Sequence, residues 1–209
     1  MAGGVAPPQR ARPRVLNVGG NSRAIALPAP YAGFEQVLLD IDPAGQPDIV
    51  CDARQLQTLP PATFEAVYCS HNLEHYHRHE VPRVLAGFLH VLKDGGFAHV
   101  RVPDLGALMR VVVEKNLDIE DVLYKAPAGP VRVIDVIYGF GPEIERSGHD
   151  FFGHRTGFTR ASLTRTLASA GFSRVYTRLG RLEVGAVAFK GEPAPGTIEL
   201  FKLQNARRG

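Results

Sequence analysis

The chain has 209 residues, of which 44% are hydrophobic and 22% charged, and its formal net charge is +3. This length allows one full-sized domain with at most a small appendage. The sequence has no run of about 18 apolar residues, the length that a transmembrane helix needs, and its basic start lacks the apolar region of a signal peptide. Basic and acidic residues alternate over most of the chain, whereas nucleic-acid binding normally needs a concentrated basic patch. We therefore expect a cytoplasmic protein with neither a membrane nor a nucleic acid as partner.

The first half of the chain contains five short apolar runs of strand length, at residues 14–18, 36–39, 48–51, 66–69 and 97–102. Several are rich in Val and Ile, as strands buried on both faces of a sheet are. Residues 80–92 repeat apolar side chains at helical spacing. Pro82 suits the first turn of this helix, and Asp94-Gly95-Gly96 is expected to end it.

The second half begins with another helical pattern at residues 105–124, followed by a Pro/Gly break at 127–130 and a loop-like stretch at 139–157. Thr159 is expected to cap a further helix that Gly171 ends. Two strand-like runs, 174–179 and 183–190, flank the turn residues 180–182 and predict a hairpin. The alternation of strands and helices predicts an α/β fold with a parallel sheet, to which this antiparallel hairpin is added.

Six stretches carry a family resemblance through their order and spacing: VLNVGG (15–20), VLLDIDP (37–43), DIVCDARQL (48–56), FEAVYCSHNLEH (64–75), VLKDGGFAHVRVPD (91–104) and GFTRASLTRTLASAGF (157–172). Together they resemble the class I S-adenosylmethionine-dependent methyltransferases, and most closely the small-molecule branch often labelled methyltransferase type 11. The resemblance implies a doubly wound, Rossmann-like, mostly parallel seven-stranded sheet with a C-terminal antiparallel hairpin. We expect a flexible leader at 1–13, a methyltransferase domain at 14–190 with an acceptor-shaping insert at about 104–158, and a tail at 191–209.

The opening loop departs from the family's pattern, Asp/Glu-x-Gly-x-Gly-x-Gly. The matching positions are Asn17, Gly19, Asn21 and Arg23, so one glycine stays in register. The resemblance still implies that Asn17, Gly19, Gly20 and Asn21 contact the cofactor, with Asn21 replacing a glycine because Asn tolerates positive φ. Asn17 lacks the charge of the family's acid, which predicts weaker cofactor binding without abolishing it.

Two carboxylates follow the second and third predicted strands. The resemblance implies that Asp40 accepts hydrogen bonds from both ribose hydroxyls and that Ile41 packs against the adenine. Asp42 competes for the first role, and a solvated turn acid is the other interpretation of Asp40. Asp52 is expected to accept from the adenine amino group while the N–H of Ala53 meets the ring, unless Asp52 only caps a turn.

The fourth predicted strand ends in SHNLEH, and the resemblance places Ser70 and His71 at the methionine end of the cofactor, facing the methyl acceptor. A neutral His71 imidazole would serve as a base there, because the ordinary pKa of histidine lies near neutrality. The late loop 144–158 carries His149 and His154 among three phenylalanines, and it either binds a polar ring or packs down as a loop. We assign His71, His154 and His149 as catalytic candidates.

Histidines are dense between residues 71 and 79, where His71, Glu74, His75, His77 and His79 fall together. His71 and His75 are four residues apart, a spacing that can hold zinc on a helix. However, the sequence has no HExxH pattern, and LEH occurs at this position in the resembled family without a metal. We therefore expect no metal site.

The resemblance predicts transfer of the methyl group of S-adenosylmethionine to an oxygen or nitrogen of a small molecule. A sugar or glycan-pathway intermediate is one acceptor class that the resemblance suggests, and phenolic and quinone-like acceptors are also open. The protein could also form a homodimer. The altered glycine loop motivates an alternative, a non-catalytic protein that binds a partner or senses the cofactor. A nicotinamide dehydrogenase is disfavoured because GxGxxG is missing after the first strand.

Overall fold

The computed structural model describes residues 11–208, so most of the predicted leader lies outside the described residues. The strands are β1 Arg14–Val18, β2 Glu35–Asp40, β3 Ile49–Val50, β4 Phe64–Ser70, β5 Leu92–Pro103, β6 Val122–Ala126, β7 Gly129–Arg132, β8 Arg174–Leu179, β9 Glu183–Phe189 and β10 Arg207–Arg208. The helices are α1 Val81–Val91, α2 Leu105–Lys115, α3 Val133–Tyr138, α4 Gly141–Ser147, α5 Arg160–Ser169 and α6 Thr197–Leu200. The 3₁₀ helices are η1 Ala29–Tyr31, η2 Pro43–Gly45, η3 Ala53–Thr58, η4 Leu73–His75, η5 Asp150–Phe152 and η6 Leu203–Asn205.

The main sheet has the strand order β10-β8-β9-β5-β4-β1-β2-β3. The pairs β1–β2, β1–β4, β2–β3 and β4–β5 are parallel, whereas β9 runs antiparallel to both β5 and β8. This confirms the predicted mixed α/β fold and its C-terminal hairpin, and the two-residue β10 adds an edge strand. The strand order switches sides between the neighbouring parallel strands β1 and β4, so the carboxyl ends of the parallel strands open onto a crevice there.

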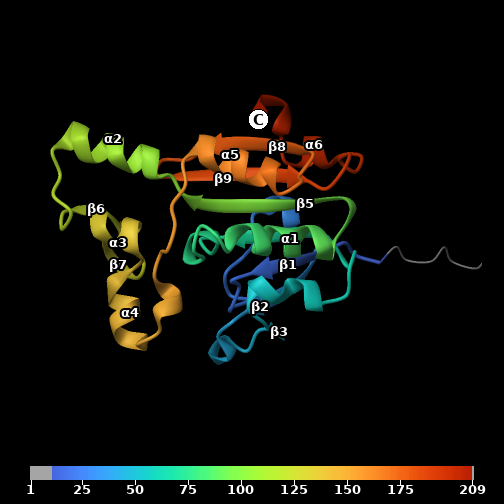
Figure 1. The fold of residues 1–209 in the computed structure, drawn as a ribbon, viewed down its shortest axis with the longest axis horizontal. Helices are drawn as coiled ribbons and strands as arrows, with labels where there is room; N and C mark the ends of the chain where they lie inside the picture. The colour runs from blue at the N-terminus through green and yellow to red at the C-terminus, as the bar shows by residue number, and fades with distance from the viewer. Residues whose placement is uncertain (1–10, 209) are drawn as a thin grey trace, which may run out of the picture.

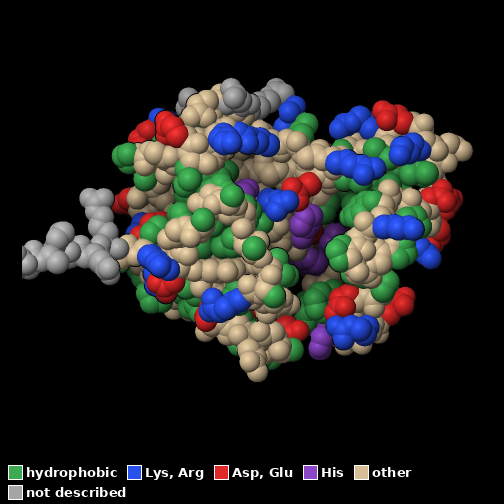
Figure 2. Space-filling view, turned by 180° about the vertical axis from the view of Figure 1, so that it is seen from behind, with side chains coloured by type: hydrophobic (Ala, Val, Ile, Leu, Met, Phe, Trp, Pro, Cys, Tyr) green, Lys and Arg blue, Asp and Glu red, His purple; other side chains and the backbone are tan. Residues whose placement is uncertain are grey.

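A lobe built from α2, β6, β7, α3 and α4 stands beside those carboxyl ends (Figure 1). The predicted helix at 105–124 ends earlier, at Lys115, because Asn116 adopts a left-handed backbone and caps α2. The last residues of that stretch, 122–124, belong to β6, which pairs with β7 in a separate antiparallel hairpin. The predicted loop at 139–157 contains α4. Figure 2 shows a hollow between the lobe and the sheet domain in which histidine side chains gather.

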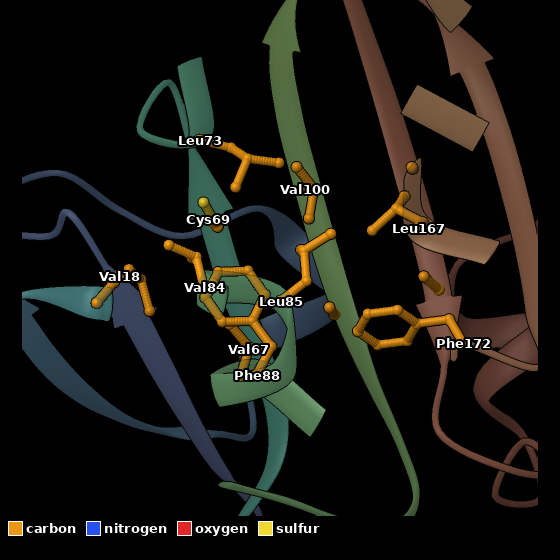
Figure 3. Packing of buried hydrophobic residues seen from close by; sticks show 14 of the residues in the cluster. Val18, Val67, Cys69, Leu73, Val84, Leu85, Phe88, Val100, Leu167 and Phe172 are labelled. Carbon is orange, nitrogen blue, oxygen red and sulfur yellow. The ribbon is translucent and has the colours of Figure 1, made fainter. Parts of the chain in front are cut away.

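The largest core cluster lies where α1 and α5 cover one face of the sheet. Leu85 and Phe88 of α1 and Leu167 of α5 are fully buried there (Figure 3). The alternation of strand side chains sends Val15, Ala66 and neighbouring residues to the opposite face. On that face the described residues supply η1 and the α6–η6 segment, so part of the predicted tail packs onto the sheet.

Two predicted helix ends have different outcomes. Thr159 caps α5 through a reciprocal pair of hydrogen bonds with Ser162, and Gly171 follows at φ 107°, as predicted. The predicted end of α1 at 94–96 is wrong, because the helix ends at Val91 and its cap is already extended. Gly95 does have a positive φ of 76°, but it lies in β5, where its N–H donates to Lys190. Within residues 11–208 no helix is long and apolar enough to cross a membrane.

Candidate functional site

A cavity of about 380 Å³ opens at the carboxyl ends of β1, β2 and β4. Parallel strands end together at one edge of a sheet, which is where ligands bind in open α/β folds. The wall combines groups from the sheet edge with groups from the late loop: Gly19, Asn21, Asp40, Ile41, Asp52, Arg54, His71, Asn72, His75, Tyr76, Glu80, Asp150, Phe151, Phe152 and Arg155. Six of the ten predicted cofactor residues are therefore brought together.

The glycine loop packs tightly against the chain that follows β4. Gly19 has φ 78°, and a Cβ placed on it would lie 2.6 Å from the Asn72 amide nitrogen. Its N–H donates to the Leu39 carbonyl at 2.8 Å, which holds the loop on β2. Asn21 is not among the residues with positive φ, so the prediction that it replaces a glycine in that conformation is wrong. The close backbone approach therefore depends on Gly19.

Asp40 and Asp42 occupy different surroundings. Asp40 lines the cavity, and burial raises the pKa of its carboxyl group. Asp42 caps η2 by accepting from the Ala44 N–H at 2.8 Å and does not line this cavity. Ile41 is a large apolar side chain that is 43% exposed at the cavity wall. The geometry thus favours Asp40 over its competitor.

Asp52 is held by Arg54, which the sequence analysis did not name. Its carboxylate accepts from the Arg54 backbone N–H at 2.8 Å and from the guanidinium at 2.5 and 2.9 Å. Burial alone would raise the pKa of Asp52, but these hydrogen bonds outweigh it and lower the pKa. Arg54 also pairs with Glu80, and this contact lowers the pKa of Glu80. Asp52 thus caps η3, as the alternative interpretation predicted, and it also lines the cavity. Ala53 is buried and does not line this cavity.

Three of the four remaining predicted cofactor residues line a second cavity of about 420 Å³ on the other side of the glycine loop. Asn17, Gly20 and Ser70 belong to its wall, together with Tyr68 and Arg101. Gly20 lies directly over Asn17, since an added Cβ would come within 2.3 Å of the Asn17 amide nitrogen. The two cavities share Gly19 and Asn21, so the loop separates them.

His71 stands at the end of β4 in a strained conformation, with φ 50°, of the kind that clusters at functional sites. Its Nε2 lies 2.9 Å from Glu183, which also pairs with Arg101. Burial alone would lower the pKa of His71, but the contacts with Glu183 and Glu74 outweigh it and raise the pKa to about 9. The imidazole therefore carries its proton at neutral pH, contrary to the neutral base that was predicted.

A third cavity, of about 230 Å³, lies between the lobe and the sheet. His71 and His154 line it from the sheet side, and its other walls come mainly from the lobe: Tyr124, Ala126, Ala128, Val131, Asp135, Val136 and Phe140. His154 Nδ1 lies 3.0 Å from the Val136 carbonyl, and burial lowers its pKa. His149, by contrast, stacks on Phe151 with ring centres 4.8 Å apart and lines none of the described cavities.

The comparisons with known proteins decide the family. A methyltransferase domain family matches residues 4–177, which is most of the chain. The chain belongs to this family. It is an S-adenosylmethionine-dependent methyltransferase of class I, as the resemblance predicted. A comparison with curated protein sequences finds no match.

Solved structures share the fold of this methyltransferase at low sequence identity. One is a 1,6-didemethyltoxoflavin-N1-methyltransferase from Burkholderia thailandensis, at 18% identity and a TM-score of 0.53, with 87% of this chain and 72% of that chain covered. A methyltransferase from Methanosarcina mazei has 15% identity and a TM-score of 0.54, covering 87% and 94%. Another, from Archaeoglobus fulgidus, has 14% identity and a TM-score of 0.51, covering 85% and 86%. These likenesses describe the fold alone.

The residues present fit the methyl donor. Gly19 allows the backbone to approach where a side chain would collide, and the Asp40 carboxylate borders the same cavity as the apolar Ile41. The sequence did not reveal Arg54 and Glu183, because the ion pairs of Arg54 with Glu80 and of Glu183 with His71 join residues that are distant in sequence. The only sequence feature that could have indicated these two residues is their charge next to apolar or strand-like residues.

Proposed function

We propose that this methyltransferase transfers a methyl group to an oxygen or nitrogen of a small molecule bound in the cavity between the lobe and the sheet. The carrying observation is that His71 lines both this cavity and the one bordered by Asp40 and Gly19. A methyl group and its acceptor must meet in line at a single point. A residue shared by the two cavities marks that point.

The cavity at the sheet edge supports binding of the methyl donor. We assign Asp40 to the ribose hydroxyls and Ile41 to one face of the adenine, since a carboxylate beside an apolar, half-exposed side chain suits this pair of groups. Asp52 borders the same cavity, although Arg54 engages both of its oxygens. In the related structure from Burkholderia thailandensis, S-adenosylhomocysteine is bound.

The cavity on the lobe side supports a small acceptor. Its volume of about 230 Å³ lies below the range of about 300–1,000 Å³ that is usual for ligand cavities, so only a small acceptor would fit. Tyr124 and Phe140 supply rings, and His71 and His154 supply polar groups, so the wall suits a ring that carries hydroxyl or amino substituents. Sugars or glycan-pathway intermediates are the first acceptors to test, and phenols are the second.

The chemistry demands mainly alignment, because S-adenosylmethionine brings a sulfonium that already activates the methyl group. The chain holds the acceptor side in place through a fixed polar framework. Glu183 orients His71 through the 2.9 Å contact and holds Arg101 through a second ion pair. The tertiary fold thereby fixes the histidine that borders both cavities.

A matched pair of variants tests the binding assignment. Asp40→Asn should weaken S-adenosylhomocysteine binding about 10- to 100-fold, the effect of losing charge-assisted hydrogen bonds, whereas Asp42→Asn should leave it unchanged. Isothermal titration calorimetry measures both, and transfer of isotope-labelled methyl to a panel of sugars, phenols and amines measures activity. Absence of cofactor binding at millimolar concentration would refute the proposal.

An alternative follows from Arg54, whose guanidinium occupies the Asp52 carboxylate. If this contact persists with the cofactor bound, Asp52 has less capacity to accept from the adenine amino group, and the cofactor would bind more weakly. Together with the altered glycine loop, weak binding would suit a protein that senses the cofactor and transfers no methyl group. Binding that depends on Asp40, together with no transfer to any panel member, would favour this second function.

A further inference from the structure

The Glu74 carboxylate is an unusual group beside the two proposed substrate cavities. Its side chain is 2% exposed, and neither of its oxygens has a hydrogen-bond partner. A buried carboxylate without partners is unfavourable, so such groups are normally paired or bound to a metal ion. The main-chain carbonyl of Glu74 accepts from Arg155 and Thr156, which anchors the late loop next to this carboxylate.

Two histidines face Glu74 with an arrangement that is typical of metal ligands. His75 Nδ1 lies 3.1 Å from the Gly153 carbonyl, and His154 Nδ1 lies 3.0 Å from the Val136 carbonyl. Metal-binding histidines usually donate one ring N–H to such an acceptor, which fixes the ring and leaves the other nitrogen for the metal. His154 Nε2 is then directed at Glu74 Oε1, 4.0 Å away.

We propose that Glu74, His75 and His154 bind a divalent metal ion of the zinc type. One donor atom from each residue lies within 4.8 Å of the others. Zinc–ligand distances near 2.0–2.2 Å place tetrahedral donors roughly 3.4 Å apart, so the donor atoms need to close by at most about 1.4 Å. Two imidazoles and one carboxylate with open positions form a set that binds zinc or related transition metals.

Two groups of His71, its carbonyl and its imidazole, lie next to the proposed ligands. His75 Nε2 lies 3.2 Å from the His71 carbonyl oxygen. When His75 donates its Nδ1 proton to the Gly153 carbonyl, the neutral ring has no second proton for the His71 carbonyl. The His71 carbonyl oxygen is therefore a further candidate ligand for the metal. The His71 side chain lies 3.5 Å from Glu74, but its other nitrogen is committed to Glu183. Compensation of Glu74 by His71 alone is the competing explanation.

The site lies between the two proposed substrate cavities, which connects it to the proposed reaction. His75 lines the cavity assigned to the methyl donor, and His154 lines the cavity assigned to the acceptor. A metal between them would bind an acceptor oxygen and favour its ionised form. This role rests on the proposed function, whereas metal binding itself does not.

The test uses untagged full-length protein treated with a chelator and then dialysed. Titration with Zn²⁺ should show one ion per chain, and Co²⁺ should give the intense visible absorption of four- or five-coordinate cobalt. Glu74→Gln and His154→Gln should each weaken Zn²⁺ binding at least 10-fold. His79→Gln is the matched control, because His79 stacks on His77 outside this group of ligands. Mg²⁺, which prefers oxygen ligands, should not compete.

Thermal unfolding separates loss of the site from loss of the fold. Zn²⁺ should raise the Tm of the wild type and of His79→Gln, but leave the Tm of a folded Glu74→Gln unchanged. No stoichiometric binding by the wild type, or equal binding by the wild type and Glu74→Gln, would overturn the proposal in favour of compensation by His71. Either result would leave cofactor binding at Asp40 untouched, so failure here is distinguishable from failure of the proposed function.

Discussion

Replacement of Gly19 by alanine is the sharpest test of the cofactor loop. Gly19 has φ 78°, a region that costs a residue with a Cβ about 1–2 kcal/mol. The new Cβ would lie 2.6–2.9 Å from three atoms of the Asn72 side chain. Asn72 can move only by giving up the hydrogen bond that it accepts from Tyr76, worth about 1 kcal/mol. The free energy of unfolding should therefore fall by about 2–3 kcal/mol.

Thermal unfolding and calorimetry measure the two consequences of Gly19→Ala. For a chain of this length the Tm should fall by roughly 4–12 °C, and S-adenosylhomocysteine should bind more weakly because Gly19 and Asn72 both line the cavity. Gly33→Ala is the matched control, since a Cβ there meets nothing within 4 Å. A Gly19→Ala protein as stable as Gly33→Ala would refute the reasoning.

Two further predictions concern stability. Leu85→Ala removes a fully buried side chain and should cost about 2–5 kcal/mol in urea unfolding, whereas Met109→Ala, at a residue 59% exposed, should change stability by less than about 0.5 kcal/mol; equal effects would contradict the assigned core. Arg54→Gln should cost about 1–2 kcal/mol at pH 7, discounted for the partial exposure of Arg54. Since Arg54 lowers the pKa of Asp52 and Glu80 in the folded state, their contribution is present above about pH 4 and is lost as pH falls through the folded pKa values. The difference from the wild type should therefore shrink by pH 3, and a constant difference would count against this ion pair.

The sequence predicted the sheet because its signals are local. Apolar runs such as 66–69 and 174–179 specify buried strands wherever they pack, and Thr159 caps α5 through a neighbour three residues away. The predicted length of α2 was wrong, because the end of this helix depends on the backbone conformation of a single residue. Asn116 ends α2 in a left-handed conformation that the helical spacing of the following residues concealed.

The candidate site was predictable only in part. Gly19 and Asp40 follow directly from strands and could be placed by motif. The protonated state of His71 could not be predicted, because it depends on a contact with Glu183, which is 112 residues away in the sequence. The ion pair of Arg54 with Glu80 could not be predicted for a similar reason, since Glu80 reaches the guanidinium that holds Asp52 only in the fold.

The sequence by itself determined the order of the strands, the family and the loop that approaches the cofactor, since hydrophobic periodicity and turn residues act over a few positions. Only the tertiary structure decided which charges meet. It brought His154 from the late loop to Glu74 in η4, 80 residues earlier, and buried that carboxylate without a hydrogen-bond partner. Electrostatic interactions depend on distance and burial, and neither quantity is written in a linear sequence.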